Sequence, residues 1–270
     1  MPELPEVETT RRGLLPRVVG RRIRDVVVRE PRLRWPVPRD LARRVRGERV
    51  TAIERRGKYL IFAVGEGHLL VHLGMSGTLG FVEDGAPLRA HDHVDLALEG
   101  GGIVRLNDPR RFGAVLWVAR PERHALIASL GPEPFDERFG GEYLHRLARG
   151  RRTPVKALVM DSHVVTGVGN IYASEALHGA GIHPARAAGR ISRARYDRLA
   201  QCVRTTLERA IAAGGTTLRD YRGAGGEPGA FQLACAVYGR AGEPCPGCGS
   251  PVATMRQAGR ATYFCPRCQR

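Results

Sequence analysis

Four of the six cysteines stand in two close pairs near the end of the 270-residue chain, Cys245-x2-Cys248 and Cys265-x2-Cys268. Two such knuckles are typical of a tetrahedral zinc site in which four thiolates complete the coordination sphere. Because no ligand position stays open, the expected Zn²⁺ is structural, and it should hold the residues between the pairs as a hairpin. This use of cysteine indicates a metal site in a reducing compartment rather than a disulfide framework.

Arg260 lies in the turn region of the expected hairpin, in the stretch Gly259-Arg-Ala-Thr-Tyr-Phe264. A planar guanidinium at this place could clamp a phosphate through two hydrogen bonds. From this feature alone, a solvated turn arginine is the favoured interpretation. Of the two remaining cysteines, Cys202 is expected in the core because it lies on an amphipathic segment, and Cys235 has no assigned role.

The chain start, Met1-Pro-Glu-Leu-Pro-Glu-Val-Glu8, carries a second chemical signal. Removal of Met1 would leave Pro2 as a free secondary amine, which can attack an electrophilic carbon and form an iminium ion. An α-amino group with a pKa near ~8 is about one-tenth neutral at pH 7, whereas a lysine at about 10.4 is almost wholly protonated. If Met1 stayed in place, the Pro2 nitrogen would be a tertiary amide without nucleophilicity.

The residues that follow Pro2 are expected to begin a helix. Pro5 suits the first helical position, because its missing N–H would be unpaired there in any case. Glu3 and Glu6 are three residues apart and are expected near one face of the helix start, where carboxylates complement the helix dipole. An ordinary acidic helix start explains these glutamates alone, but their position beside Pro2 favours a catalytic role. The expected apolar stripe is Val7, Leu14, Leu15, Val18 and Val19.

Basic residues dominate the charge of the chain. The net charge of +16 and the pI of about 10.7 suit a polyanionic partner, although a solvated basic surface would give the same values. Among 43 basic residues, Lys58 and Lys156 are the two lysines. Since arginine does not deprotonate in proteins, a lysine here is a candidate for work that needs a titratable amine, and chance survival is the alternative. Lys58 is expected at a strand start, where it could donate a proton or bind a phosphate, and Lys156 is expected to act electrostatically within its own helix.

The sequence contains neither a membrane span nor a secretory signal by pattern. No run of 18 apolar residues occurs, and the acidic N-terminal stretch lacks an apolar signal core. We therefore expect a cytoplasmic protein without membrane contact.

Residues 23–120 show a pattern of short strands separated by Gly, Pro, Asp or Asn. Close spacing without intervening helices predicts antiparallel packing, as a sandwich or an open barrel. The expected strands are Ile23–Arg29, Val50–Arg55, Tyr59–Val64, His68–Leu73, Val94–Leu98, Ile103–Leu106 and Ala114–Val118.

Helical periodicity follows a Pro- and Gly-rich boundary at Leu130-Gly-Pro-Glu-Pro134. Thr153-Pro154 is expected to open one helix, with Thr153 as the cap. Gly167-Val-Gly-Asn170 predicts a tight turn before a short helix over Ile171–Gly179, where Asn170 could either bind a phosphate or cap the helix. Ser192 is expected to cap a longer helix that ends at Gly214-Gly215. Its apolar stripe is Tyr196, Leu199, Val203, Leu207 and Ile211.

Two expected loops each place a bulky residue beside glycine. They are His72-Leu-Gly-Met-Ser-Gly77, with Met75, and Asn107-Asp-Pro-Arg-Arg-Phe-Gly113, with Phe112. Such side chains could enter a base step as wedges, but taken alone they are more often core plugs. His91-Asp-His93 lacks further metal ligands at a convincing spacing, so phosphate contact or strand-edge packing is the favoured interpretation.

Taken together, these motifs resemble the formamidopyrimidine-DNA glycosylases, a bacterial DNA-repair family, over nearly the whole chain. The resemblance implies an α+β fold with an antiparallel β-sandwich and active-site helix, a helix–two-turns–helix domain and a four-cysteine zinc finger. The matching stretches, in chain order, are PELPEVE, RRGKYL, HLGMSG, HDHVD, NDPRRFG, GVGNIYASE, GGTTLRDY, VYGR and GRATYFC.

The resemblance implies catalytic roles at both ends of the chain. Pro2 would attack C1′ of the damaged nucleoside, with Glu3 as proton donor and Glu6 supporting the site. Lys58 would assist the first elimination of a phosphate from the resulting iminium, and Arg260 would assist the second.

The resemblance also implies DNA contacts. Residues at DNA-contacting positions are His91, Arg110, Arg151 and Asn170, and the trio that fills the gap left by an extruded nucleotide is Met75, Arg110 and Phe112. Extrusion is needed because the reacting sugar carbon is unreachable inside the base stack. The loop over the flipped base would fall in 214–230 and include Arg219 and Tyr221, although some relatives carry Lys where Arg219 stands.

The expected organisation is a catalytic β-sandwich domain over 1–130, a linker over 131–150, a helix–two-turns–helix domain with the lesion-capping loop over 151–230, and a zinc finger over 235–270. The expected function is excision of oxidised purines from double-stranded DNA and cleavage at the abasic site, by a bacterial, nucleoid-associated monomer. Alternatives are an oxidised-pyrimidine-specific relative resembling endonuclease VIII, which usually opens PEGPE where this chain has Leu4, and a noncatalytic zinc-ribbon nucleic-acid-binding protein.

Overall fold

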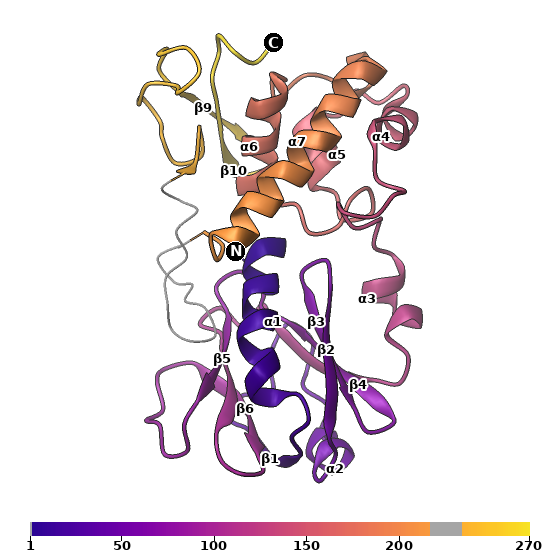
Figure 1. The fold of residues 1–270 in the computed structure, drawn as a ribbon, viewed down its shortest axis with the longest axis vertical. Coiled ribbons are helices and arrows are strands. Elements are labelled where there is room, and N and C mark those ends of the chain that lie inside the picture. Colours follow the sequence, from indigo (N-terminus) through magenta and orange to yellow (C-terminus); the bar gives the residue numbers. More distant parts are fainter. Residues whose placement is uncertain (1, 217–233) are drawn as a thin grey trace. The chain divides into compact units, whose positions relative to one another are not determined.

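The computed structural model of the chain describes residues 2–216 and 234–270. Its internal contacts define two compact units (Figure 1). The first is Met1–Ala128 with Ala213–Ala230, and the second is Ser129–Ala212 with Phe231–Arg270. No helix among the described residues is both long enough and apolar enough to cross a membrane.

Helix α1, Leu4–Val18, opens the first unit. Glu3 is its N-cap, and Pro5 occupies the second helical position rather than the predicted first one. Val7, Leu14 and Val18 are buried as predicted, because they recur on one face of the helix. Val19 was wrongly included in this stripe: it lies just after the helix in an extended conformation and is exposed.

The first unit contains two four-stranded antiparallel sheets, which confirms the predicted packing (Figure 1). One sheet has the order β1-β6-β7-β5, with bounds Ile23–Val28, Asp92–Leu98, Ile103–Asn107 and Thr78–Val82. The other has the order β2-β3-β4-β8, with bounds Val50–Arg56, Tyr59–Val64, Gly67–His72 and Ala114–Val118. Apolar residues of both sheets and of α1 form one buried cluster, so the unit is a sandwich closed by a helix.

Two elements of the first unit were not predicted from the sequence pattern. Strand β5 lies at a sheet edge and buries Leu79 among otherwise half-buried residues, so it has little apolar alternation to detect. Helix α2, Leu41–Val45, is a single short turn that buries its two ends. Short elements Pro121–Arg123 and α3, Ala125–Ala128, complete the unit.

The second unit contains four α-helices among its described residues: α4, Gly141–Ala148; α5, Val155–Met160; α6, Asn170–Ala180; and α7, Arg193–Ala212. A 3-10 turn, Ala188–Arg190, precedes α7. Helix α4 falls inside the segment predicted as a linker. Its Leu144 is fully buried and its Tyr143 hydroxyl donates to Val164 O at 2.8 Å, so this segment is a packed part of the unit.

Two helix boundaries and one buried stripe differ from the prediction. Pro154, rather than Thr153, is the N-cap of α5, and no side chain caps that helix. Helix α6 begins one residue early, with Gly169 as its N-cap and Asn170 as its first residue. In α7, Ala210 rather than Ile211 completes the buried stripe, because Ala210 lies three positions after the buried Leu207.

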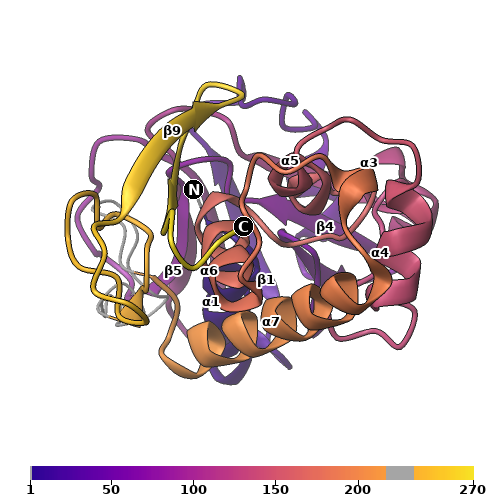
Figure 2. The ribbon, with the colours of Figure 1, turned by 90° about the horizontal axis from the view of Figure 1, so that it is seen from above.

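The C-terminal residues form the predicted hairpin. Strands β9, Ala253–Gln257, and β10, Arg260–Phe264, pair antiparallel, with Arg260 opposite Gln257. Strand β10 packs on α6, and the two views show the hairpin beside this helix (Figures 1 and 2).

Candidate functional site

The start of α1 buries two carboxylates next to Pro2. Glu3 is 1% exposed and Glu6 0%, and Pro2 is buried. Glu6 Oε2 accepts a hydrogen bond from the Glu3 N–H at 2.8 Å, and Glu6 Oε1 accepts one from the Thr216 N–H at 2.8 Å. The Glu3 N–H belongs to the peptide bond that follows Pro2. Glu6 therefore anchors the chain start to residues 215–216, where a Cβ on Gly215 would come within 3.2 Å of its carboxylate.

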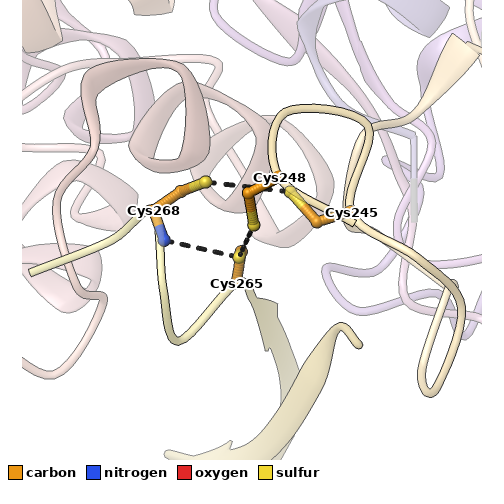
Figure 3. A group of neighbouring side chains, drawn as sticks. All are labelled: Cys245, Cys248, Cys265 and Cys268. Atoms are coloured by element: carbon orange, nitrogen blue, oxygen red, sulfur yellow. Dashed lines mark hydrogen bonds between the residues drawn. The ribbon is translucent and has the colours of Figure 1, made fainter. Parts of the chain in front are cut away.

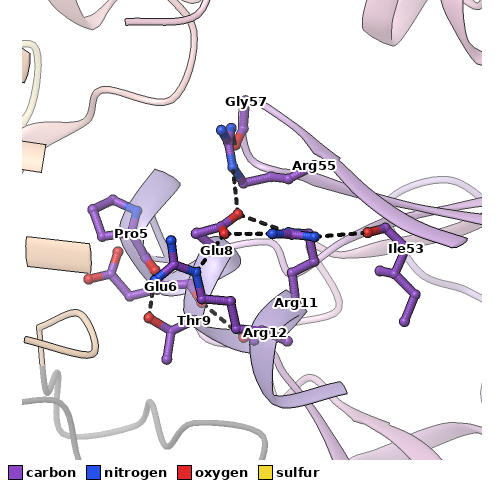
Figure 4. Close-up of polar contacts among 10 residues, drawn as sticks. Pro5, Glu6, Glu8, Thr9, Arg11, Arg12, Ile53, Arg55 and Gly57 are labelled. Carbon is purple, nitrogen blue, oxygen red and sulfur yellow. Dashed lines mark hydrogen bonds and ion pairs between the residues drawn. The ribbon is translucent and has the colours of Figure 1, made fainter. Parts of the chain in front are cut away.

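Glu8, a third carboxylate of α1 with no predicted role, lies among three arginines (Figure 4). Arg11 and Arg12 each donate to it at 2.8 Å, and Arg55 Nε lies 3.3 Å away. Desolvation raises the pKa of Glu8, but the hydrogen bonds from Arg11 and Arg12 outweigh it and lower the pKa to about 2. Arg55 also donates to Gly57 O at 3.0 Å, so the network ties α1 to the β2–β3 turn. Helical spacing of Glu8 with two arginines was the available sequence signal.

Lys58 lies in that β2–β3 turn, rather than at the predicted strand start. Gly57 adopts a positive φ of 57° and makes the chain reverse, so the strand itself begins at Tyr59. Lys58 is half-buried, which suits a cation that must reach a ligand while its stem packs against the protein.

His72 is a candidate site residue that opens one of the quoted motifs but to which the sequence analysis assigned no role. It pairs with Tyr59 across β3 and β4, and their ring centroids are 4.7 Å apart. Burial lowers the pKa of His72 to about 4, and the positive charges of Lys58 and Arg34 act in the same direction. Its Nδ1 accepts from the Gly74 N–H at 3.0 Å, so the neutral ring carries its proton on Nε2. Strand register beside Lys58 was the signal that could have found it.

The two loops with bulky residues approach each other backbone to backbone. A Cβ on Gly74 would lie 2.6 Å from Gly113 N and 2.6 Å from the Phe112 carbonyl carbon. Phe112 is 41% exposed, and the Arg110 guanidinium stacks over its ring at 4.8 Å. The core-plug interpretation is therefore wrong for Phe112, while Met75 is half-buried.

The two histidines of the 91–93 stretch have different environments. His91 is exposed and adopts a φ of 72°, which is uncommon for a residue with a side chain. His93 is buried, and its Nε2 lies 3.0 Å from Asp108 O. Neither histidine belongs to a metal-compatible group among the described residues.

The side chain of Lys156 contacts residues outside its own helix, whereas the prediction gave it an electrostatic role within that helix. Its side chain is 2% exposed, and its Nζ donates to Asn170 Oδ1 at 2.7 Å and to Thr262 Oγ1 at 2.8 Å. Asn170 Nδ2 in turn donates to Ala261 O at 3.0 Å. The amide of Asn170 thus joins α6 both to β10 and to α5, and it does not cap its helix.

A cleft of about 250 Å³ opens beside this buried lysine. Its lining includes Lys156, Asn170, Gln257 and Arg260, so two of the predicted phosphate contacts face one space within the second unit. Arg260 is exposed at the first position of β10. Arg151 is exposed ahead of α5 and does not line the cleft. Arg219 and Tyr221 lie outside the described residues.

The four knuckle cysteines gather into one cluster (Figure 3). Their sulfur atoms all lie within 4.8 Å of one another, with Cys248 and Cys265 at 3.4 Å and Cys245 and Cys268 at 3.9 Å. None forms a disulfide. Zn–S bonds of about 2.3 Å in a tetrahedron place sulfur atoms about 3.8 Å apart, so the cluster fits one structural zinc ion.

Helix α6 holds the segment that leads into this cluster. Glu175 accepts backbone hydrogen bonds from Ala236, Val237 and Tyr238 at 2.7, 3.0 and 2.8 Å. His178, one turn later, places its Nε2 3.3 Å from a knuckle sulfur. These contacts span more than sixty residues of sequence, and local patterns do not reveal them.

Three family models match the chain: the formamidopyrimidine-DNA glycosylase N-terminal domain over residues 1–115, the H2TH domain of the same enzyme over 130–222, and a zinc finger found in FPG and IleRS over 242–270. The formamidopyrimidine-DNA glycosylases of Methylococcus capsulatus and Syntrophotalea carbinolica are 59% and 57% identical, with 100% of each chain covered.

Solved structures agree. The MutM (FPG) protein from Thermus thermophilus is 42% identical with a TM-score of 0.90, covering 99% of this chain and 98% of its own. Lactococcus lactis Fpg in complex with DNA containing an abasic site is 34% identical with a TM-score of 0.93, covering 99% of both chains. Sequence, fold and the four-cysteine cluster therefore agree, and the chain belongs to the formamidopyrimidine-DNA glycosylase family of DNA-repair enzymes, with a structural zinc finger.

Proposed function

We propose that the protein excises oxidised purines, notably 8-oxoguanine and formamidopyrimidines, from double-stranded DNA and then cleaves the abasic strand by β,δ-elimination. The observation that carries this proposal is the buried Glu6 carboxylate, which fixes the peptide bond following Pro2 through a 2.8 Å hydrogen bond. Related structures were solved with abasic-site DNA and with DNA containing a Fapy-dG derivative. The protein acts at the bacterial nucleoid, where this substrate occurs, and it acts as a monomer.

Pro2 is the proposed nucleophile once Met1 is removed. Its nitrogen forms a bond to C1′ as the bond from C1′ to the base breaks, and Glu3 supplies a proton during this step. Loss of the nitrogen proton and opening of the sugar ring give an iminium ion. The positive charge acidifies the C2′ proton, whose removal expels the 3′-phosphate, and a second elimination then expels the 5′-phosphate.

Lys58 and Arg260 are the proposed proton donors for the first and second eliminations. Lys58 fits this role because it is half-buried in a turn braced by the Glu8 and Arg55 network. Arg260 fits because it faces a cleft with Asn170, where a guanidinium and an amide can share one phosphate. His91 and Arg151 are proposed as further backbone contacts, since both are exposed cations or potential cations.

Met75, Arg110 and Phe112 are proposed to fill the space that an extruded nucleotide leaves. The stacked and exposed Phe112 ring supports this role, because an apolar side chain at such a loop tip has no core to fill. Arg219 and Tyr221 remain proposed contacts to the flipped base. The zinc ion, when bound, supplies structural rigidity to the hairpin that carries Arg260 and takes no part in the reaction.

The direct test is competition between duplexes that carry 8-oxoguanine opposite cytosine and thymine glycol opposite adenine. We expect faster excision of 8-oxoguanine, together with complete loss of strand cleavage when the Pro2 nitrogen is blocked by acetylation, which leaves no free amine to form the iminium, in protein that retains its DNA affinity. Preference for thymine glycol would favour the pyrimidine-specific alternative. Duplex binding without any excision by folded, zinc-loaded protein would favour the noncatalytic alternative.

A further inference from the structure

Asp108 is a fully buried carboxylate that opens the loop 107–113. Its side chain is 0% exposed, directly after β7 ends at Asn107. Its Oδ2 accepts a hydrogen bond from the Gly113 N–H at 2.7 Å, so the carboxylate bridges the two ends of the loop. Its Oδ1 has no hydrogen-bond partner within the described parts of the chain. Against this desolvation, the backbone N–H groups of Gly113, Arg110 and Arg111 all favour its charged form, so the loop backbone converges on this one carboxylate.

The backbone of Asp108 joins the same loop to the 91–93 stretch. Its N–H donates to His91 O at 3.0 Å, and its carbonyl lies 3.0 Å from His93 Nε2 and accepts from the Arg111 N–H at 3.1 Å. The position of His91, with its unusual positive φ, is therefore coupled to the start of the loop.

The far end of the loop is coupled to the second loop through Gly113. A Cβ on Gly113 would lie 2.7 Å from His72 O and 2.9 Å from Asp108 Oδ2. This glycine is therefore packed closely between the two, with no room for a side chain. Gly74 approaches the same peptide, as described above, and Met75 follows it directly. The carboxylate of Asp108 thus fixes the place where both loops meet.

The exposed side chains of the loop 107–113 are not held in place by packing against the protein core. Phe112 and Arg110 are both exposed and contact each other, so burial does not hold them in place. Their positions follow from the backbone of residues 108–113, and a wedge that enters a base step must be placed to within about 0.5 Å.

We propose that Asp108 is a positioning residue for base extrusion: its carboxylate holds the loop that carries Arg110 and Phe112, and through Gly113 the loop that carries Met75, in the geometry needed to enter the base stack. This inference rests on the proposed wedge role of those three side chains. Asp108 itself touches neither the DNA nor the reacting atoms.

The test compares Asp108→Ala with Asp108→Asn. Asparagine keeps an acceptor for the Gly113 N–H, whereas alanine removes the acceptor. Asp95→Asn is the matched control, because Asp95 is a buried aspartate of β6 that pairs with Arg105 and Arg29 rather than with the backbone of residues 108–113.

Three measurements separate positioning from folding. Stopped-flow fluorescence of 2-aminopurine beside an 8-oxoguanine in duplex DNA follows extrusion. Excision from the same duplex gives kcat/KM, and borohydride trapping on a single-stranded abasic oligonucleotide measures the Pro2 chemistry without a base stack to open. We expect Asp108→Ala to slow extrusion and lower duplex kcat/KM by about tenfold or more, while trapping on the single strand stays within about twofold.

Asp108→Asn should restore extrusion to near the wild-type rate, and Asp95→Asn should lower thermal stability without a selective loss of extrusion. Equal losses in extrusion and single-strand trapping for Asp108→Ala, or no rescue by asparagine, would overturn the inference. Absence of any trapping in the wild-type protein would instead refute the proposed function, so the two failures are distinguishable.

Discussion

Replacement of Glu6 by glutamine should loosen the chain start. Within the described parts of the chain, the carboxylate accepts one hydrogen bond on each oxygen, from the N–H groups of Glu3 and Thr216. Glutamine has one acceptor oxygen and one NH₂ donor, so after Glu6→Gln one of these two N–H groups faces a donor. Glu6 and Thr216 are both 0% exposed, and water therefore cannot replace the lost acceptor.

The magnitude follows from this burial. A hydrogen bond to a charged group contributes about 1.5–3 kcal/mol, and a buried donor left unsatisfied costs about 1–3 kcal/mol, so we expect a loss of about 3 kcal/mol. If this loss falls on the active arrangement of the Pro2–Glu3 peptide, the rate of imine formation drops by about a hundredfold. The matched control is Glu8→Gln. Its arginine partners are partly exposed, with Arg12 at 59%, and we expect a loss of about 1 kcal/mol or less.

The assay combines urea unfolding with the rate of borohydride-trapped adduct on a preformed abasic oligonucleotide, under conditions where both variants are folded. The reasoning is refuted if Glu6→Gln traps at the wild-type rate with unchanged stability, or if Glu8→Gln has the larger effect on trapping.

Three further predictions concern the metal, the buried lysine and pH. Removing zinc by chelation should unfold the C-terminal hairpin and weaken duplex binding while the first unit keeps its melting transition, because the apolar cluster around the knuckles is small. Lys156→Met should destabilise the second unit by about 1–3 kcal/mol, since it leaves the fully buried Thr262 hydroxyl without this donor, and it should weaken duplex affinity through Asn170. The Glu8 pKa of about 2 lies below its ordinary value of 4.5, so its stabilising contribution is present above about pH 4.5 and is lost as pH falls toward 2. After a discount for the partial exposure of Glu8, this contribution to the free energy of unfolding is about 1 kcal/mol.

Each of these has a contrary outcome. Retained hairpin structure and affinity after stoichiometric zinc loss would contradict the first. Unchanged urea unfolding of Lys156→Met would contradict the second, with Ala157→Ser on the exposed side of the same helix as a control. For the third, unfolding free energies of the wild type and Glu8→Gln should converge between pH 4.5 and pH 2. Parallel curves over that range would show that the ion pairs contribute nothing.

Local patterns were sufficient for much of the fold. The strands Tyr59–Val64 and Ala114–Val118 have their predicted bounds, since continuous apolar runs end at clear turn residues. The zinc ligands follow from spacing alone, because both halves of each knuckle lie within one turn. The edge strand β5 has too few buried residues to produce a pattern.

The contacts that organise the candidate site were beyond such patterns. Glu6 meets Thr216 across 210 positions and Lys156 meets Thr262 across 106, and neither residue type nor periodicity encodes these pairings. Asp108 lies inside the motif NDPRRFG, but the sequence analysis assigned roles only to its neighbours Arg110 and Phe112. The role of a buried polar residue depends on its hydrogen-bond partners in the folded protein. Because those partners are distant in sequence, local patterns do not predict them.

Direct identification of the atom that bonds the sugar tests the account best. The processed protein is incubated with a duplex containing 8-oxoguanine and borohydride, digested, and sequenced by mass spectrometry. We predict one deoxyribose-derived adduct on the nitrogen of Pro2 in a chain that has lost Met1. An adduct on Lys58, Lys156 or any other side chain, or strand cleavage by protein that retains Met1, would contradict it.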